Sequence, residues 1–150
     1  MKKGENSMAL DEKIAELLSQ KFHCSQIMMQ IGLDALDLDE PNLVKAMTGL
    51  AGGLGGCGKN CGALTGGVCM ISLFAGRGAA EEEAGPELET MVSEFLLWFE
   101  ETYGSADCGD IIQGDKDNIS STCPQLICAA CRKALELLQS YGFPVEKVLE

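Results

Sequence analysis

Eight cysteines are the residues of this 150-residue chain whose side chains carry the most specific chemistry. One stands alone near the start, three fall in a glycine-rich stretch, and four lie near the end: Cys24, Cys57, Cys61, Cys69, Cys108, Cys123, Cys128 and Cys131. Thiolates bind metals, ligate iron–sulfur clusters and exchange disulfides. Free cysteines also serve as small core residues, so their number alone does not decide between chemistry and packing.

The last three cysteines have the spacing C-x4-C-x2-C, which plant-type ferredoxins use to ligate a cluster. In ferredoxins the run is a loop, whereas QLICAACRKALELL has the pattern of a helix interior. We therefore discount this match. Cys128 and Cys131, three residues apart on one predicted helix face, either form part of a metal site or pack in the core.

The chain has one histidine, His23, and no C-x-x-C-H motif. A single histidine excludes zinc sites that need two, and it excludes a catalytic histidine elsewhere in the chain. The missing motif argues against covalently attached haem. His23 lies beside Cys24 and is either a ligand or a helix-surface residue; we favour the second.

The stretch GGLGGCGKNCGALTGGVC, residues 52–69, holds eight of the eighteen glycines. It nearly fits two nucleotide-binding loops, but a helical pattern precedes it and Asn60 replaces the hydroxyl that would hold Mg²⁺, so we predict no nucleotide site. If Cys61 begins a helix, the unpaired N–H groups and the dipole of that helix would lower the pKa of the Cys61 thiol. The alternative is a packing loop with a buried neutral thiol.

The net charge is -12, from 23 acidic and 11 basic residues. This charge repels nucleic-acid phosphates and anionic lipid headgroups, so we expect neither partner. No signal-like apolar run begins the chain and none reaches the ~18 residues of a membrane span, so we expect a cytoplasmic protein without membrane insertion. In that reducing compartment, dense cysteines indicate metal or thiol chemistry more often than structural disulfides.

Apolar residues recur at helical spacing along most of the chain, and no stretch alternates like a strand. The expected helices run from Leu10 to Ile31 with an end at Gly32, from Pro41 towards the glycines, over 61–75 and over 88–104. The last expected helix follows Thr122 or Cys123, has Pro124 in its first turn and continues to Gly142. We expect a loop at GRGAAEEEAGPE and a short appended tail, FPVEKVLE. The prediction is an all-α single domain over 1–150, with its core at about 9–142: a bundle of about five helices with a Gly/Cys-rich loop.

Four segments, CSQ at 24–26, GGLGGCGKNCGALTGG, GSADCGDIIQGD and TCPQLI, occur in the order seen in a known family. The chain resembles the redox-active proteins of the C_GCAxxG_C_C family over nearly all of 16–140, although Asn60 stands where the family label has glycine. The resemblance implies that the family cysteines are Cys24, Cys61, Cys108 and Cys123. It also implies that Gly62, Ala63 and Gly66, which complete CGALTG, are cofactor-binding residues. It also implies a small helical, prokaryotic redox protein, often encoded beside transporter genes.

Split-Soret cytochromes are similar over the same module and add haem attachment, an iron–sulfur cluster and a dimer. Because this chain lacks the haem motifs, only the cluster would be shared. The apolar FLLWF segment around Trp98 offers a homodimer face as readily as a core. A redox partner protein of unknown identity is the other partner we expect.

Three hypotheses follow from these residues. In the first, the four family cysteines are metal ligands of an iron–sulfur cluster or a zinc ion, and the glycine loop donates N–H groups to the sulfurs. In the second, Cys61 is a reactive thiolate that exchanges with a partner's disulfide, and one of the other three resolves it. In the third, the thiols only pack and the chain is a partner or regulatory module associated with a transporter.

Overall fold

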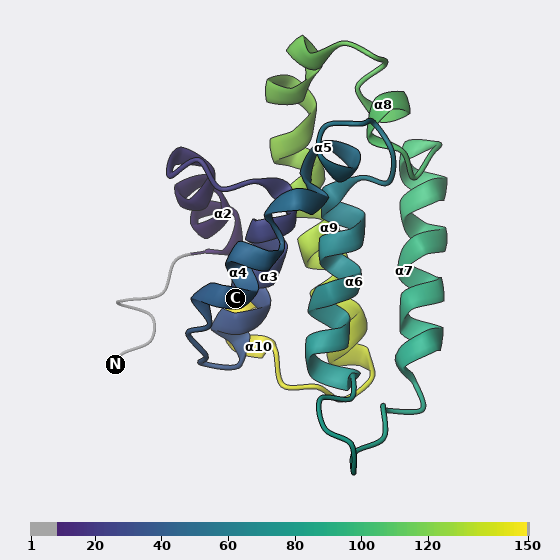
Figure 1. The fold of residues 1–150 in the computed structure, drawn as a ribbon. Helices are drawn as coiled ribbons and strands as arrows, with labels where there is room; N and C mark the ends of the chain where they lie inside the picture. The colour runs from purple at the N-terminus through teal and green to yellow at the C-terminus, as the bar shows by residue number, and fades with distance from the viewer. Residues whose placement is uncertain (1–8, 150) are drawn as a thin grey trace.

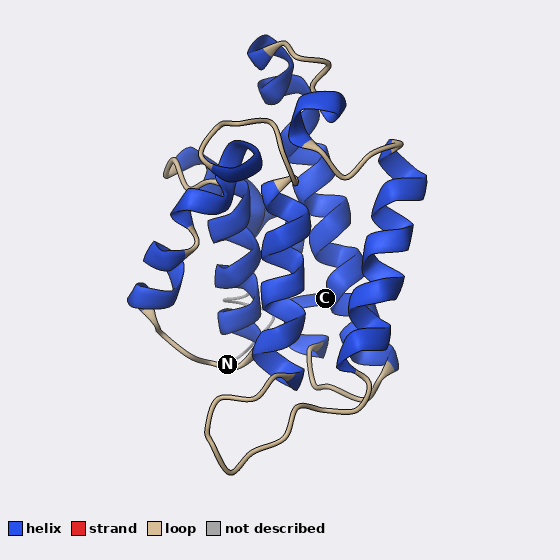
Figure 2. Cartoon of the chain, turned by 45° about the vertical axis from the view of Figure 1, so that its right-hand side comes forward, coloured by secondary structure: helices blue, strands red, loops and turns tan. Residues whose placement is uncertain are grey.

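A computed structural model describes residues 9–149, and this part of the chain contains helices and no strands (Figure 2). The α-helices are α2 (Leu10–Ser19), α3 (Cys24–Ala35), α4 (Pro41–Ala46), α5 (Ala51–Leu54), α6 (Gly62–Ala75), α7 (Leu88–Tyr103), α8 (Cys108–Ile111), α9 (Ile119–Ser140) and α10 (Glu146–Leu149), and the 3-10 turns are η1 (Thr48–Leu50) and η2 (Lys116–Asn118). The predicted all-α class is confirmed.

The prediction of about five helices matches the number of long helices but does not include all of the short ones. Five described helices have ten or more residues: α2, α3, α6, α7 and α9. The helix predicted from Pro41 towards the glycines begins as α4 but ends at Ala46, and η1 and α5 follow it as separate short elements. Residues 1–8, which bear on the expected lack of a signal segment, lie outside the described residues, as does Glu150. Between residues 9 and 149, none of the helices combines the length and apolar character needed to cross a bilayer.

Four helices, α3, α6, α7 and α9, form the body of the bundle. Helix α6 contacts each of the other three (Figure 1). Short elements close the two ends differently. At one end α5, α8 and the start of α9 gather, whereas the predicted charged loop between α6 and α7 turns at the other end (Figure 1). The first of these ends carries the cysteines discussed below.

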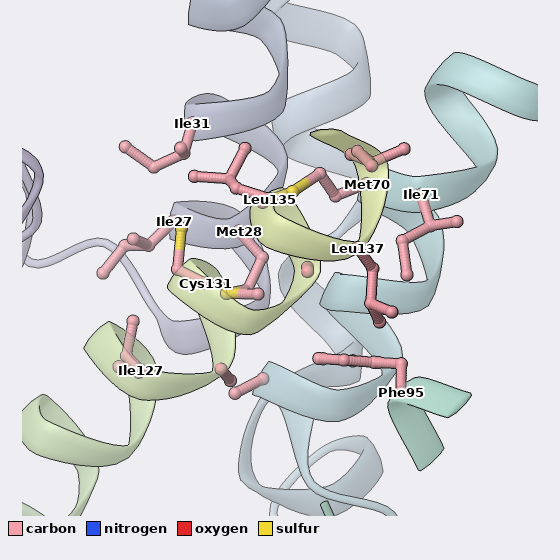
Figure 3. Close-up of a cluster of buried hydrophobic side chains, with 14 of the residues drawn as sticks. Ile27, Met28, Ile31, Met70, Ile71, Phe95, Ile127, Cys131, Leu135 and Leu137 are labelled. Carbon is pink, nitrogen blue, oxygen red and sulfur yellow. The ribbon is translucent and has the colours of Figure 1, made fainter. Parts of the chain in front are cut away.

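The core between these helices is built from aliphatic, methionine and aromatic side chains. Ile27, Met28, Met70, Phe95 and Leu135 are each 0 % exposed (Figure 3). They come from α3, α6, α7 and α9, so each helix contributes one apolar stripe to a shared interior. Burying such side chains is the main favourable term that holds the helices together.

Glycines set how closely α6 approaches its neighbours. A Cβ atom at Gly66 would lie 2.9 Å from the Cα of Ser25 on α3, and one at Gly67 would lie 2.5 Å from the ring of Phe95 on α7. On α3, a Cβ at Gly32 would lie 2.8 Å from Cγ of Met70 on α6. These glycines therefore serve close helix packing.

The predicted helix from Leu10 to Ile31 was wrong in one respect, because it is broken into α2 and α3. Lys21 adopts a φ of 71°, and the N–H groups of Lys21 and Phe22 donate to the carbonyls of Leu18 and Leu17. This is a Schellman ending with lysine in the position that glycine usually takes. The helical pattern resumes at Cys24, and Gly32 lies inside α3 rather than at its end.

The start of the last long helix was also predicted too late, since α9 begins at Ile119. Pro124 is its sixth residue and therefore lacks the N–H that would donate to Ser120. Ser120 is exposed, so water can satisfy its carbonyl and the helix continues. As a consequence, Cys123 lies within the helix and not before it.

The tail after Gly142 folds back onto the bundle rather than projecting as an appendage. Val145 is 0 % exposed within the main core, and Phe143 makes an edge-on contact with Phe74. The α10 residue Lys147 pairs with Asp37, which follows α3. The chain end thus covers the side of α3 and α9.

We predict that Gly66→Ala destabilises the protein by about 1–3 kcal/mol. Alanine favours helix over glycine, but its methyl group would force α3 and α6 apart against a tightly packed core. Denaturant unfolding measures this free energy. Gly49→Ala is the matched control, because a Cβ there meets nothing within 4 Å; equal unfolding free energies for the two variants would contradict the packing role of Gly66.

Candidate functional site

A cavity of about 490 Å³ opens at the end of the bundle where α5, α8 and the start of α9 gather. Its lining includes sulfur, glycine backbone and apolar side chains. The four cysteines of the family pattern, Cys24, Cys61, Cys108 and Cys123, all contribute to this lining. Residues separated by almost 100 positions in the sequence thereby face one space.

Cys24 is the first residue of α3, a position created by the break after α2. The backbone N–H groups of Gly52 and Ser25 lower the pKa of its thiol, but burial has the larger effect and leaves the pKa above its ordinary value. Gly62 lies directly beside it, because a Cβ at Gly62 would come within 2.5 Å of Cys24 Sγ. The first glycine of CGALTG therefore makes room for this sulfur.

Cys61 caps the N-terminus of α6, as predicted. The N–H groups of Ala63 and Leu64 lower the pKa of the thiol, which is the expected effect of a helix N-terminus. Of the two alternatives that the sequence left open at Cys61, a low-pKa thiolate and a buried neutral thiol, the structure favours the second. Cys61 is only 7 % exposed, and its burial raises the pKa to about 12, because desolvation of the thiolate outweighs the two amides.

Cys108 is held against Cys61 by backbone hydrogen bonds rather than by side-chain packing. The Cys61 N–H donates to the Ala106 carbonyl over 2.8 Å, and the Cys108 N–H donates to the Lys59 carbonyl over 2.7 Å. A third bond runs from the Gly109 N–H to the Gly58 carbonyl over 3.0 Å. We call this set of three bonds the backbone clamp.

Cys123 faces the cavity from α9. Burial raises the pKa of its thiol to about 11, and the neighbouring sulfurs of Cys24 and Cys108 raise it further in the same direction. Cys24 and Cys108 also raise the pKa of Cys61. Ionising several of these thiols together is therefore unfavourable unless positive charge lies among them.

The other four cysteines have separate surroundings. Cys57 is exposed in the glycine loop, and Cys69 packs beside a small cluster of Met29, Leu33 and Met47. The C-x4-C-x2-C run lies inside α9, where Cys131 is fully buried and Cys128 interacts with Asp11. Of these, none lines the cavity formed by the described residues.

The glycine loop contains a feature that the sequence analysis missed. Five consecutive residues, Gly52, Gly53, Leu54, Gly55 and Gly56, have φ values between 63° and 80° and form a left-handed turn. Several such residues in series are rare without glycine. This turn directs the Gly52 N–H towards Cys24, and the run of paired glycines is the sequence signal that could have indicated it.

Apolar side chains complete the lining and were not predicted as site residues: Leu18, Phe22, Ile112, Ile119, Leu126 and Ile127. Gly62 also lines the cavity, whereas Ala63 is buried behind Cys61 and Gly66 contacts α3. His23, Thr48 and Lys116 supply the polar side chains.

Between residues 9 and 149, no group of three or more histidine, cysteine, aspartate or glutamate side chains is arranged to hold a metal ion. A zinc ion would need sulfurs converging at about 2.3 Å from one point, which would require these side chains to rotate. An iron–sulfur cluster takes four cysteines around a larger volume. Four cysteines that line one cavity are a donor set that a zinc ion or an iron–sulfur cluster would use.

In a comparison with protein-family models, residues 22–137 match the family described as "Putative redox-active protein (C_GCAxxG_C_C)". This range includes all four cysteines of the cavity. Searches of curated proteins and of solved structures found no match.

We predict a defined order of alkylation for the reduced, metal-free protein treated with iodoacetamide. Exposed Cys57 reacts first, whereas Cys61, with a pKa of about 12, reacts at least about tenfold more slowly at pH 8. The Cys61 rate keeps rising from pH 8 to 10, because the thiolate fraction grows about tenfold per pH unit below the pKa. Peptide mass spectrometry measures both rates; a Cys61 rate that levels off below pH 9 would show a low-pKa thiolate instead.

We also predict that Gly109→Ala loosens Cys108 selectively. A Cβ at Gly109 would lie 3.1 Å from the Gly58 carbonyl oxygen and would therefore strain the backbone clamp. Alanine favours a helical backbone more than glycine does, so α8 itself should still form. Alkylation of Cys108 should accelerate at least about threefold, because the segment opens more often. Cys123 should react unchanged, and Gly49→Ala again serves as control. Equal acceleration at Cys108 and Cys123 would mean that the whole end of the bundle opens.

Proposed function

The chain belongs to the C_GCAxxG_C_C family of redox-active proteins, and from this premise we propose that Cys24, Cys61, Cys108 and Cys123 ligate an iron–sulfur cluster used for electron transfer. The observation that carries the proposal is the cavity lined by all four thiols. Four cysteines are the usual ligand set of such clusters, whereas one disulfide needs only two.

The surroundings of the thiols support a site for a charged redox centre. Burial raises the pKa of each of the four, so the metal-free site favours neutral thiols. Iron would supply the positive charge that makes four adjacent thiolates stable. Zinc would supply it too, but its ligands must converge more closely.

When bound, the cluster would supply one-electron transfer, and the chain's own groups would tune it. The N–H groups of Gly52, Ala63 and Leu64 point towards ligand sulfurs. Such donors stabilise negative charge on sulfur and so favour the reduced state. Buried Leu126 and Ile127 limit water at the inner wall, which reduces screening of these interactions.

Thiol–disulfide exchange is the second candidate, because the four thiols are free and influence one another's ionisation. In that reaction a thiolate attacks a partner's disulfide, and a second cysteine then displaces the mixed disulfide as the partner leaves reduced. The raised pKa of Cys61 makes it a poor attacking group at neutral pH. We therefore place exchange second to cluster binding.

We expect the protein purified without oxygen to be brown and to contain iron and acid-labile sulfide. Serine replacement of Cys24, Cys61, Cys108 or Cys123 should remove most of the iron and the visible absorption, because each change deletes one ligand. Metal analysis and absorption spectra measure the effect.

Cys57→Ser and Cys128→Ser are the matched controls, since neither residue lines the cavity, and both variants should keep the iron. A colourless, metal-free and folded wild-type protein would contradict cluster binding. If that protein also forms a reversible disulfide between two of the four cysteines, exchange becomes the function. If it does neither, the packing and partner hypothesis stands.

A further inference from the structure

The cavity extends beyond the cysteines along α9. Ile119, Cys123, Leu126 and Ile127 all line it, and their spacing puts them on one face of the helix. At about 1.5 Å per residue, this stripe is about 12 Å long. Cys123 occupies only one point on it, so most of the stripe is an apolar wall that ligation of a cluster would not use.

The stripe runs from an open mouth to a closed floor. Ile119 is 39 % exposed, whereas Leu126 and Ile127 are 2 % and 1 % exposed. Leu18 and Phe22 add apolar surface from the end of α2 and the following turn. The whole cavity, including the space beside the four cysteines, measures about 490 Å³, within the range of about 300–1,000 Å³ for pockets that take small organic molecules. The shape suits a compact apolar body inserted from the mouth.

The mouth carries a single positive charge. Among the described residues that line the cavity, Lys116 is the one with a formal charge at neutral pH, three residues before Ile119. The neighbouring Asp115 carboxylate accepts a hydrogen bond from the Asp117 N–H and so caps its own turn. Neither aspartate lines the cavity. An anionic group at the outer end of a ligand would therefore meet Lys116.

We propose that the cavity binds a small organic molecule with an apolar body and one anionic group. The body lies along the α9 stripe and the anion lies beside Lys116. This binding does not require a cluster.

The test uses two fluorescent probes with reduced, metal-free protein. One is 8-anilinonaphthalene-1-sulfonate, which has an apolar ring body and one anionic group; the other is N-phenyl-1-naphthylamine, which has a similar body without the charge. Both should titrate to one saturable site. Lys116→Gln should weaken the sulfonate about two- to fivefold, as expected for a solvent-exposed ion pair, and leave the uncharged probe unchanged.

A second variant, Ile119→Asp, tests the apolar wall. Residue 119 begins α9, where an acidic side chain suits the helix dipole, so the fold should persist and circular dichroism checks this. Both probes should bind at least about tenfold more weakly, because a carboxylate replaces apolar surface. Lys133→Gln and Leu97→Asp are controls on α9 and α7 outside the cavity, and both should bind as the wild type.

Non-saturable binding would overturn the proposal, as would unchanged affinity in both cavity variants. Loss of binding in Leu97→Asp would assign the probes to the exposed face of α7 instead. Probe binding is measured without iron and iron content is measured without probes. The failure of this inference is therefore distinguishable from the failure of cluster binding.

Discussion

The candidate site depends on the close approach of α6 to α3 at the points where two glycines stand. Gly62 leaves space for Cys24 Sγ, and Gly66 lets the helix backbone rest against Ser25. Without this approach, the N-terminal cysteines of α3 and α6 would not face one cavity. The CGALTG motif therefore contains both a cysteine of the site, Cys61, and the two glycines whose packing positions it. These residues span about one and a half turns of helix.

The four cysteines are held in two different ways. Cys24, Cys61 and Cys123 belong to helices or helix starts of the bundle, whereas Cys108 is attached through the backbone clamp. The clamp fixes main-chain positions without side chains, and this leaves the sulfur free to turn towards a ligand. Burial raises the pKa of the thiols and so disfavours thiol–disulfide exchange, which needs a thiolate. The same exclusion of water would strengthen the electrostatic contacts of a bound iron–sulfur cluster, in which iron compensates the charge of the thiolates.

Much of the fold follows from the sequence, because amphipathic spacing and the turn residues around α6 and α7 act locally. The break at Lys21 was missed because this residue has the left-handed conformation that ends a helix, and the residue found there is usually glycine rather than lysine. The early start of α9 was missed because Pro124 suggested a first turn. The family resemblance supplied the four cysteines, but the pKa of Cys61 depends on burial, which only the tertiary structure determines. The apolar wall also depends on contacts between distant segments, whereas the left-handed turn has a local signal in its paired glycines that the sequence analysis did not use.

The most direct test of a four-cysteine redox centre is a crystal structure of protein purified without oxygen, with anomalous diffraction recorded on both sides of the iron absorption edge. The account predicts an iron-dependent peak inside the cavity, bordered by the sulfurs of Cys24, Cys61, Cys108 and Cys123. An empty cavity with a disulfide between two of these residues, or iron bound elsewhere on the chain, would contradict it.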